Sequence, residues 1–272
     1  MHTVVLFRKK KSSGAVNLMN LLFIGDVVGD SGCMFLRKNL YRIKQEYKID
    51  VTIANGENSA HGNGITKSSA ESLTGSGVDI LTTGNHAFRR KEIGDIFERE
   101  NIIRPANYPE GCIGHGWSVF DFGKYQLAVV NLMGTVYMDS LDNPFSTIDR
   151  ILPEIDTPNI IVDFHAEASS EKKCMGFYLA GKVSAVLGTH THVQTSDEAI
   201  LKNHTGYITD VGMTGPEESV LGVSIEDALK KQRFKTPVLF TESENPAFLN
   251  AVVLEIDTRV GKCAKITRLV LR

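Results

Sequence analysis

Residues 21–29 read LLFIGDVVG, an apolar run that is interrupted by a glycine and an aspartate near its end. A continuous apolar run of this kind is typical of a strand that is buried on both faces of a sheet. Apolar and aromatic side chains then recur every three to four residues at positions 35, 36, 40, 43 and 47, which predicts one face of a helix. A buried strand followed by such a helix indicates an α/β fold.

The same alternation continues along the chain. Further strands are expected at residues 51–54, 79–83, 119–122, 127–131, 160–164, 183–187, 249–256 and 266–271, and helices at residues 69–73, 91–100 and 224–233 and between 164 and 183. Gly123-Lys124 joins two of these strands and is typical of a hairpin, so the strands are not all parallel. No linker rich in proline, glycine or serine divides the chain, and we expect residues 19–272 to form one domain.

The composition is that of an ordinary globular protein, with 42% hydrophobic and 23% charged residues among 272. Thirty Lys and Arg residues nearly balance 32 Asp and Glu residues, and the formal net charge is −2. This balance argues against a protein that grips nucleic acid or an anionic membrane through bulk charge. No apolar run approaches the roughly 18 residues that a membrane-spanning helix needs.

The first residues of the chain differ from the rest. Residues 4–7 are apolar and precede the basic residues 8–11, which is the reverse of the order in a secretory signal. The regular pattern begins only near residue 20, so we expect residues 1–18 to be an N-terminal extension outside the fold. The four cysteines form no Cys-x-x-Cys pair, which favours a reduced, cytoplasmic protein.

Five of the expected strands end in side chains that can bind a metal or transfer a proton. In chain order these are Asp26, then Glu57 and Asn58, then Asn85 and His86, then His165, and finally His190 and His192. Ligands of open α/β sheets bind beyond the carboxyl ends of the strands, so these side chains converge if the strands are neighbours. In an extended segment, His190 and His192 would also point the same way.

Each of these residues has a structural explanation when it is taken singly. Asp26 is a suitable turn residue or helix cap, and Asn85 suits a left-handed turn. A histidine at a strand end, such as His165, is often a hydrogen-bonded structural residue. The repetition at the same place in successive strands favours a functional site over these explanations.

The donors of this set exceed the needs of one ion. Without His86, the two carboxylates, two amide oxygens and three imidazoles are too many for a tetrahedral zinc, but they suit two six-coordinate ions that share a bridging carboxylate. Two metals about 3.5–4 Å apart, with a hydroxide between them, are suited to in-line displacement at phosphorus. The strand ends therefore predict a dinuclear phosphoesterase centre.

The sequence also resembles a known family. The supporting stretches are FIGDVVG (residues 23–29), NGEN (55–58), TGNH (83–86), GTHTHVQT (188–195) and TDVGMTGP (209–216). They are similar to those of the calcineurin-type metallophosphoesterases and, within them, of the YmdB-like bacterial phosphodiesterases, from residue 19 to the C-terminus. We accordingly expect a four-layer α/β sandwich, in which helices flank two mixed β-sheets and a dinuclear centre lies at one edge.

The resemblance implies a role for each site residue. Asp26, Glu57, Asn58 and His192 would hold the first metal, and Glu57, Asn85, His165 and His190 the second, with Glu57 as the bridge. His86 would donate a proton to the leaving oxygen. Val28 stands where the wider superfamily has a histidine ligand, and the extra oxygen donor Asn58 favours iron, then manganese, over zinc.

The expected reaction is hydrolysis of a small phosphodiester, namely a 3′,5′- or 2′,3′-cyclic nucleotide. The alternatives are another metallophosphohydrolase, either a phosphomonoesterase or a nuclease, and a regulatory metal-binding protein that acts through partner contacts. No membrane partner is expected, nucleic acid is not indicated by the charge, and a homo-oligomer is compatible with the sequence.

Several other residues stay open at this stage. His61 and His115 lie in glycine-rich loops, where they either touch substrate or are ordinary loop histidines. Residues 134–145 form either a lid over the site or a surface crossing. Asp163 either orients His165 or faces solvent.

Overall fold

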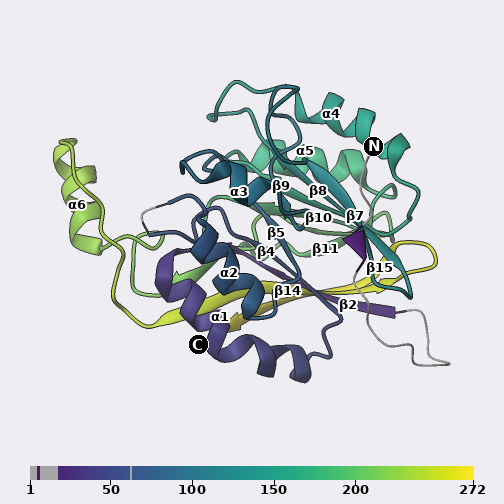
Figure 1. Cartoon of the computed structure of the whole chain (residues 1–272), viewed down its shortest axis with the longest axis horizontal. Coiled ribbons are helices and arrows are strands. Elements are labelled where there is room, and N and C mark those ends of the chain that lie inside the picture. Colours follow the sequence, from purple (N-terminus) through teal and green to yellow (C-terminus); the bar gives the residue numbers. More distant parts are fainter. Residues whose placement is uncertain (1–4, 7–17, 62) are drawn as a thin grey trace.

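The computed structural model describes residues 5–6, 18–61 and 63–272 and shows two β-sheets packed face to face between helices (Figure 1). Sheet A has the strand order β1-β7-β8-β9-β10-β12-β11. Sheet B has the order β3-β13-β14-β2-β4-β5-β6, and β15 pairs with β14. Sheet A is mixed, because β7 and β8 form the antiparallel hairpin expected at Gly123, whereas β8, β9 and β10 run parallel. Sheet B is mixed as well, because β2 is antiparallel to β14 and parallel to β4.

The strands and helices expected from the sequence are present with shifted bounds, but the strands at Ile102–Ile103, Ala199–Leu201, Thr205–Ile208 and Met213–Pro216 and the helix at Pro144–Ile151 were not expected. Sheet A comprises β1 (Val5–Leu6), β7 (Trp117–Asp121), β8 (Gln126–Met133), β9 (Ile160–His165), β10 (Ala185–Thr189), β11 (Ala199–Leu201) and β12 (Thr205–Ile208). Sheet B comprises β2 (Leu18–Ile24), β3 (Asp26–Val27), β4 (Val51–Asn55), β5 (Ile80–Thr82), β6 (Ile102–Ile103), β13 (Met213–Pro216), β14 (Ala247–Asp257) and β15 (Lys262–Leu271). The helices are α1 (Gly29–Glu46), α2 (Lys67–Gly75), α3 (Ile93–Phe97), α4 (Pro144–Ile151), α5 (Ser169–Leu179) and α6 (Ile225–Phe234).

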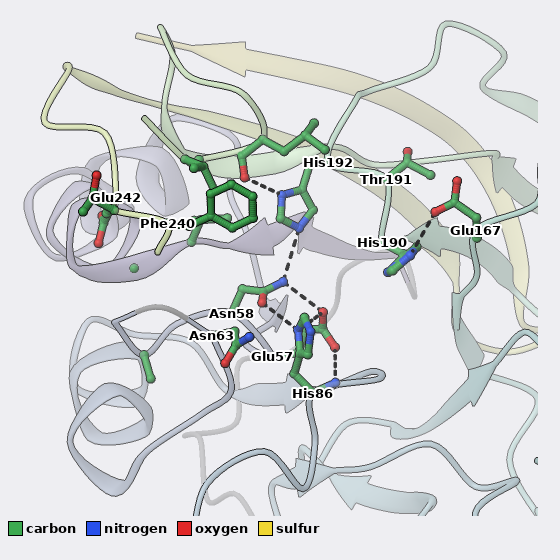
Figure 2. Close-up of a pocket in the computed structure, with 17 residues that line it drawn as sticks. Glu57, Asn58, Asn63, His86, Glu167, His190, Thr191, His192, Phe240 and Glu242 are labelled. Carbon is green, nitrogen blue, oxygen red and sulfur yellow. Dashed lines mark hydrogen bonds and ion pairs between the residues drawn. The ribbon is translucent and has the colours of Figure 1, made fainter. Parts of the chain in front are cut away.

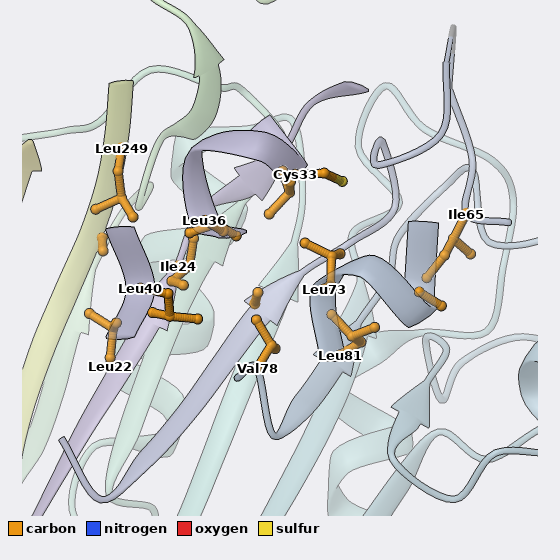
Figure 3. Packing of buried hydrophobic residues seen from close by; sticks show 14 of the residues in the cluster. Leu22, Ile24, Cys33, Leu36, Leu40, Ile65, Leu73, Val78, Leu81 and Leu249 are labelled. Carbon is orange, nitrogen blue, oxygen red and sulfur yellow. The ribbon is translucent and has the colours of Figure 1, made fainter. Parts of the chain in front are cut away.

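Strand β2 shows how its sequence separates two layers. Successive side chains of a strand point to opposite faces. Leu22 and Ile24 therefore pack with Leu36 and Leu40 of α1, as Figure 3 shows, whereas Leu21 and Phe23 lie in the core between the two sheets. Because both faces of β2 are covered, residues 21–24 are all apolar and buried.

Strand β8 separates the other two layers in the same way. Leu127 and Val129 face the core between the sheets, whereas Val130 and Leu132 pack in a third cluster with Ile148 of α4 and residues of α5. The order of layers is thus α1 and α2, sheet B, sheet A, then α4 and α5. The expected four-layer sandwich of two mixed sheets is confirmed.

Some expected boundaries are wrong. The run 21–28 is not one strand, because the chain breaks at Gly25 and pairs afresh as β3 with β13. The backbone of Gly25 approaches Gly212 so closely that a Cβ atom would collide with the Gly212 carbonyl. The helix expected at 91–100 is regular only over α3.

The expectation that residues 1–18 lie outside the fold falls mostly outside the described residues. Of those described, Val5 and Leu6 pair in parallel with Phe120 and Asp121 at the edge of sheet A, and Leu18 begins β2. Among the described residues, no helix combines the length and the apolar character needed to cross a bilayer.

The connection between β13 and β14, residues 217–246, leaves the sandwich. Helix α6 lies in the middle of this connection and forms its tip, away from the body of the protein in Figure 1. We call residues 217–246 the arm.

The contact at Gly25 gives a stability test. Gly25→Ala should lower the free energy of unfolding by about 1–3 kcal/mol or more, since a rigid backbone carbonyl must shift to admit the methyl group. Gly75→Ala is the control, because nothing lies within 4 Å of a Cβ there, and it should be neutral or slightly stabilising. Equal urea midpoints for the two variants would contradict the packing described here.

Candidate metal centre

The carboxyl ends of five strands open into one pocket. β2, β4 and β5 are parallel neighbours in sheet B, and β9 and β10 are parallel neighbours in sheet A. The segments that follow them meet where the two sheets come together, so the site draws residues from both. All eight residues singled out in the sequence lie here: Asp26, Glu57, Asn58, Asn85, His86, His165, His190 and His192.

One group of side chains gathers around Nε2 of the buried His165. This atom lies 2.9 Å from Oδ1 of Asn85, 3.1 Å from Nδ1 of His190 and 3.3 Å from Oε2 of Glu57. One potential ligand atom from each of Glu57, His165 and His190 lies within 4.8 Å of the others. Four donors thus face a common point.

A second group lies on the other side of Glu57. Nδ2 of Asn58 is 2.9 Å from Oε1 of Glu57 and 3.2 Å from Nε2 of His192, which in turn lies 3.8 Å from Oδ1 of Asp26. Oδ1 of Asp26 is buried and has no hydrogen-bond partner. The two carboxylate oxygens of Glu57 therefore face the two groups separately.

His190 and His192 reach different groups because their backbone is not extended. Strand β10 ends at Thr189, and φ is +102° at His190 and +62° at His192. The expectation that the two rings point the same way is therefore wrong. Nδ1 of His192 lies 3.1 Å from the carbonyl oxygen of Leu221, to which it can donate, and Nε2 is then free to bind a ligand.

Asp163 supports His165 from beneath. It is fully buried and accepts a hydrogen bond of 2.6 Å from the hydroxyl of Thr189, which lies 2.9 Å from Nδ1 of His165. Thr189 can accept the Nδ1 proton, so that Nε2 carries a lone pair for the cluster. Of the two alternatives left open for Asp163, the structure shows that it orients His165 through Thr189.

A buried ion pair fixes the loop that carries His190 and His192. Lys172 of α5 and Asp210 are both almost completely buried, with Nζ and Oδ2 2.6 Å apart. The same oxygen accepts hydrogen bonds from the backbone N–H and the hydroxyl of Thr191, at 3.0 and 2.7 Å. Asp210 belongs to the stretch at residues 209–216 that carries the family resemblance, but the sequence does not indicate its pairing with Lys172.

Glu167 is a further residue that the sequence reasoning missed. Its carboxylate lies 3.1 Å from Nε2 of His190, and it lines the pocket. A carboxylate on the outer nitrogen of a ligating histidine fixes the ring and raises its basicity. Its position two residues after His165, at the end of β9, was the available signal.

The cluster concentrates negative charge in a buried place. Burial would raise the pKa of Glu57, but the charges and hydrogen bonds of His165 and His86 outweigh it and hold this pKa well below its usual range. Burial would lower the pKa of His165, but the carboxylates of Glu57, Asp26 and Asp163 raise it to about 9. Burial and the charge of His165 lower the pKa of His190 to about 3, which leaves a neutral ring.

His86 lies at the edge of the cluster with about a quarter of its side chain exposed. Its Nδ1 is 2.9 Å from Oδ1 of Asn58 and 3.2 Å from Oε1 of Glu57, and its backbone N–H donates to Oε2 of Glu57. The ring nitrogen available to a molecule in the pocket is therefore Nε2. His86 lines the pocket directly.

The pocket has a volume of about 360 Å³ and joins the cluster to the arm (Figure 2). Leu221, Val223 and Phe240 of the arm also line it. Residues 134–145, one candidate for this wall, contribute none of its lining residues. His61 and His115 also lie elsewhere, His61 beside a neighbouring cleft and His115 in one lined by Arg104.

The sequence model of the YmdB-like protein family matches residues 22–269. The chain belongs to this family. The resemblance read from the sequence is thereby confirmed.

Relatives of this YmdB-like chain cover nearly all of it. The 2′,3′-cyclic-nucleotide 2′-phosphodiesterase of Bacillus subtilis is 46% identical over 256 residues, which cover 93% of this chain and 97% of the relative. A crystal structure of a hypothetical protein from Thermus thermophilus has 40% identity and a TM-score of 0.89, covering 93% of this chain and 98% of that one. A novel phosphatase from Mycoplasma pneumoniae has 33% identity and a TM-score of 0.90, covering 94% of both chains.

The ion pair beneath the histidine loop can be tested with two adjacent lysines. Lys172→Ala leaves Asp210 buried without its cation and should lower the free energy of unfolding by about 3–5 kcal/mol. Lys173→Ala removes a lysine that is half-exposed and paired with Asp197, and should cost less than about 1 kcal/mol. Urea denaturation of metal-free protein measures both. Similar losses for the two variants would show that the buried pair does not hold the loop.

Proposed function

We propose that this chain is a dinuclear metal-dependent phosphodiesterase that hydrolyses 2′,3′-cyclic nucleotides. The observation that carries the proposal is the pair of donor groups that share Glu57 at the floor of an open pocket. The name of the Bacillus subtilis relative favours the 2′,3′-cyclic class over the 3′,5′-cyclic class.

The donors fit metal ions on two grounds. The buried Oδ1 of Asp26 has no partner, which is costly unless a cation or another donor satisfies it. The second ground is that the shifted pKa of His165 reports an excess of buried anions around it, and a metal would take the place of its proton.

We assign the ligands as two sets with a shared bridge. Asp26, Glu57, Asn58 and His192 would hold one ion, and Glu57, Asn85, His165 and His190 the other. Asn58 would have to turn its amide, because its oxygen faces His86 while its nitrogen faces the cluster. The oxygen-rich first set favours iron, then manganese, over zinc.

The ions, when bound, would activate water and neutralise charge that develops on the phosphoryl oxygens. The chain itself positions the groups around them. Glu167 holds the ring of His190, and Thr189 holds the ring of His165. Asp210 holds the loop between β10 and His192 by accepting a hydrogen bond from the backbone N–H of Thr191. Rigid support of this kind keeps the reacting groups in a productive arrangement.

His86 is the proposed proton donor. The leaving alkoxide of a ribose is strongly basic, and a positioned acid contributes on the order of 10²–10⁴-fold to its departure. Oε1 of Glu57 lies 3.2 Å from Nδ1 of His86, so a proton on Nε2 points to the pocket whichever way the amide of Asn58 is turned. This proton would pass to the ribose oxygen as its bond to phosphorus breaks.

We further propose that residues 19–272 form a single catalytic domain and that the reaction takes place in the cytoplasm. The shared cores of the two sheets support the first point. The four free thiols, Cys33, Cys112, Cys174 and Cys263, support the second.

Metal content tests the shared bridge. Protein purified without chelators or oxygen should carry about two transition-metal equivalents per chain. Glu57→Ala should lose both ions and nearly all activity, since its two oxygens face both groups, whereas Asn58→Ala should mainly weaken one site. Elemental analysis gives the counts, and two ions retained by Glu57→Ala would rule out the bridge.

The role of His86 can be separated from metal binding by the choice of substrate. His86→Ala should keep its ions, lose on the order of 10²–10⁴-fold in rate on a 2′,3′-cyclic nucleotide, and lose much less on a nitrophenyl phosphodiester. The reason is that nitrophenolate leaves without protonation. Equal losses on the two substrates would assign His86 to positioning or charge stabilisation, and loss of metal would make it a ligand or its support.

A further inference from the structure

The arm is attached to the metal centre at its base. The carbonyl oxygen of Leu221 lies 3.1 Å from Nδ1 of His192. At the next residue, Gly222 has φ of +97° and packs so closely on Val28 that a Cβ atom would collide with its side chain. The segment of the arm that precedes α6 therefore lies directly against His192, which would hold the first ion, and against Val28.

Glu242 fixes the segment of the arm that follows α6. The carboxylate of Glu242 accepts hydrogen bonds from the hydroxyl of Ser31 at 2.6 Å and from its backbone N–H at 3.1 Å, in the first turn of α1. An acceptor at this place satisfies a free N–H group and favours the helix dipole. The backbone of Glu242 also forms an isolated antiparallel β-bridge with Val223, which precedes α6. These contacts set the position of Phe240, two residues earlier.

Phe240 and its neighbour Leu239 differ in their position relative to the pocket. Phe240 lines the pocket, and 48% of its surface remains exposed. Leu239 is 89% exposed and does not line the pocket. Figure 2 shows the ring of Phe240 on the arm side of the pocket, with Asn58, Glu57 and His86 on the other side. The arm therefore holds a flat apolar face toward the space next to the metal ligands.

We propose that Phe240 binds the nucleobase of the substrate by stacking, and so makes the site selective for base-bearing cyclic phosphates. The inference rests on the proposed function, which places the phosphate at the metal ligands. A base attached to that phosphate through ribose then lies along the rest of the pocket wall, whose apolar residues are Val28, Ala60, Leu221, Val223 and Phe240. Among these residues only Phe240 carries an aromatic ring. Every base has a π-face, so stacking on Phe240 binds nucleotides without requiring one particular base.

Two cyclic phosphates test this proposal. 2′,3′-Cyclic AMP carries a base, and glycerol 1,2-cyclic phosphate has the same strained ring without one. Phe240→Ala should raise KM for 2′,3′-cyclic AMP on the order of tenfold and leave kcat/KM for the glycerol compound unchanged. Phe240→Trp should keep the wild-type KM, and Phe240→Leu should resemble Phe240→Ala. Leu239→Ala is the matched control and should leave both substrates unaffected.

The result that would overturn the proposal is equally specific. If Phe240→Ala lowers kcat/KM for both compounds by the same factor, the ring supports the pocket and does not bind the base. If it lowers kcat/KM for neither compound, the base lies elsewhere. A KM for Phe240→Leu equal to that of the wild type would show that apolar contact suffices without stacking.

A binding measurement keeps this test separate from the proposed activity. The natural chain has one tryptophan, Trp117 of β7, which does not line the pocket. Phe240→Trp adds a reporter whose fluorescence 3′-AMP should quench, while ribose 3-phosphate and the wild-type control should show no quenching. If metal-loaded wild-type protein hydrolyses neither cyclic phosphate, the proposed function fails, but the quenching still tests base binding. Absence of quenching at saturating 3′-AMP overturns the role of Phe240.

Discussion

The structure depends on a carboxylate that is buried where two sheets meet. Glu57 is 1% exposed and is contacted by His165 of sheet A and by the backbone N–H of His86 from sheet B. A buried anion is tolerated only when cations and hydrogen-bond donors surround it. Its surroundings therefore have to be basic or metal-loaded, and this requirement brings histidines from strands far apart in sequence to one place.

Glycines at the strand ends allow this approach. A Cβ atom at Gly84, which follows β5 of sheet B, would collide with His165 of sheet A and with Glu57. The glycine that stands beside several of the site residues is thus explained by space: the sheets can bring their carboxyl ends together only where side chains are missing. A glycine that is needed only for the backbone conformation of a turn would not have to lie against the donor side chains.

The sequence allowed most of the fold and the members of the site to be predicted, because these depend on local signals. Apolar runs identified the longer strands but not the short strands β6, β11, β12 and β13, and donors after five of the expected strands identified the site. The division of the strands between two sheets, and the break at Gly25, depend on contacts between distant segments. The same holds for Lys172 and Asp210, which form a buried pair although 38 residues separate them. The positive φ angles of His190 and His192 follow from the tethering of their loop to Asp210, Asp26 and Leu221, which no local pattern announces.

Two kinds of structure build the site. The donors lie at strand ends, which the packed sheets hold in place. Part of the apolar wall lies on the arm, which connects β13 and β14, two antiparallel neighbours in sheet B. A connection between such strands can change in length and sequence without disturbing their pairing. The wall is nevertheless tied to the centre, because Leu221 orients His192 and Glu242 caps α1. A change in the arm that moves Phe240 would therefore act first on the proposed binding of the base, and on the proposed metal ligands only if it also breaks the contact between Leu221 and His192.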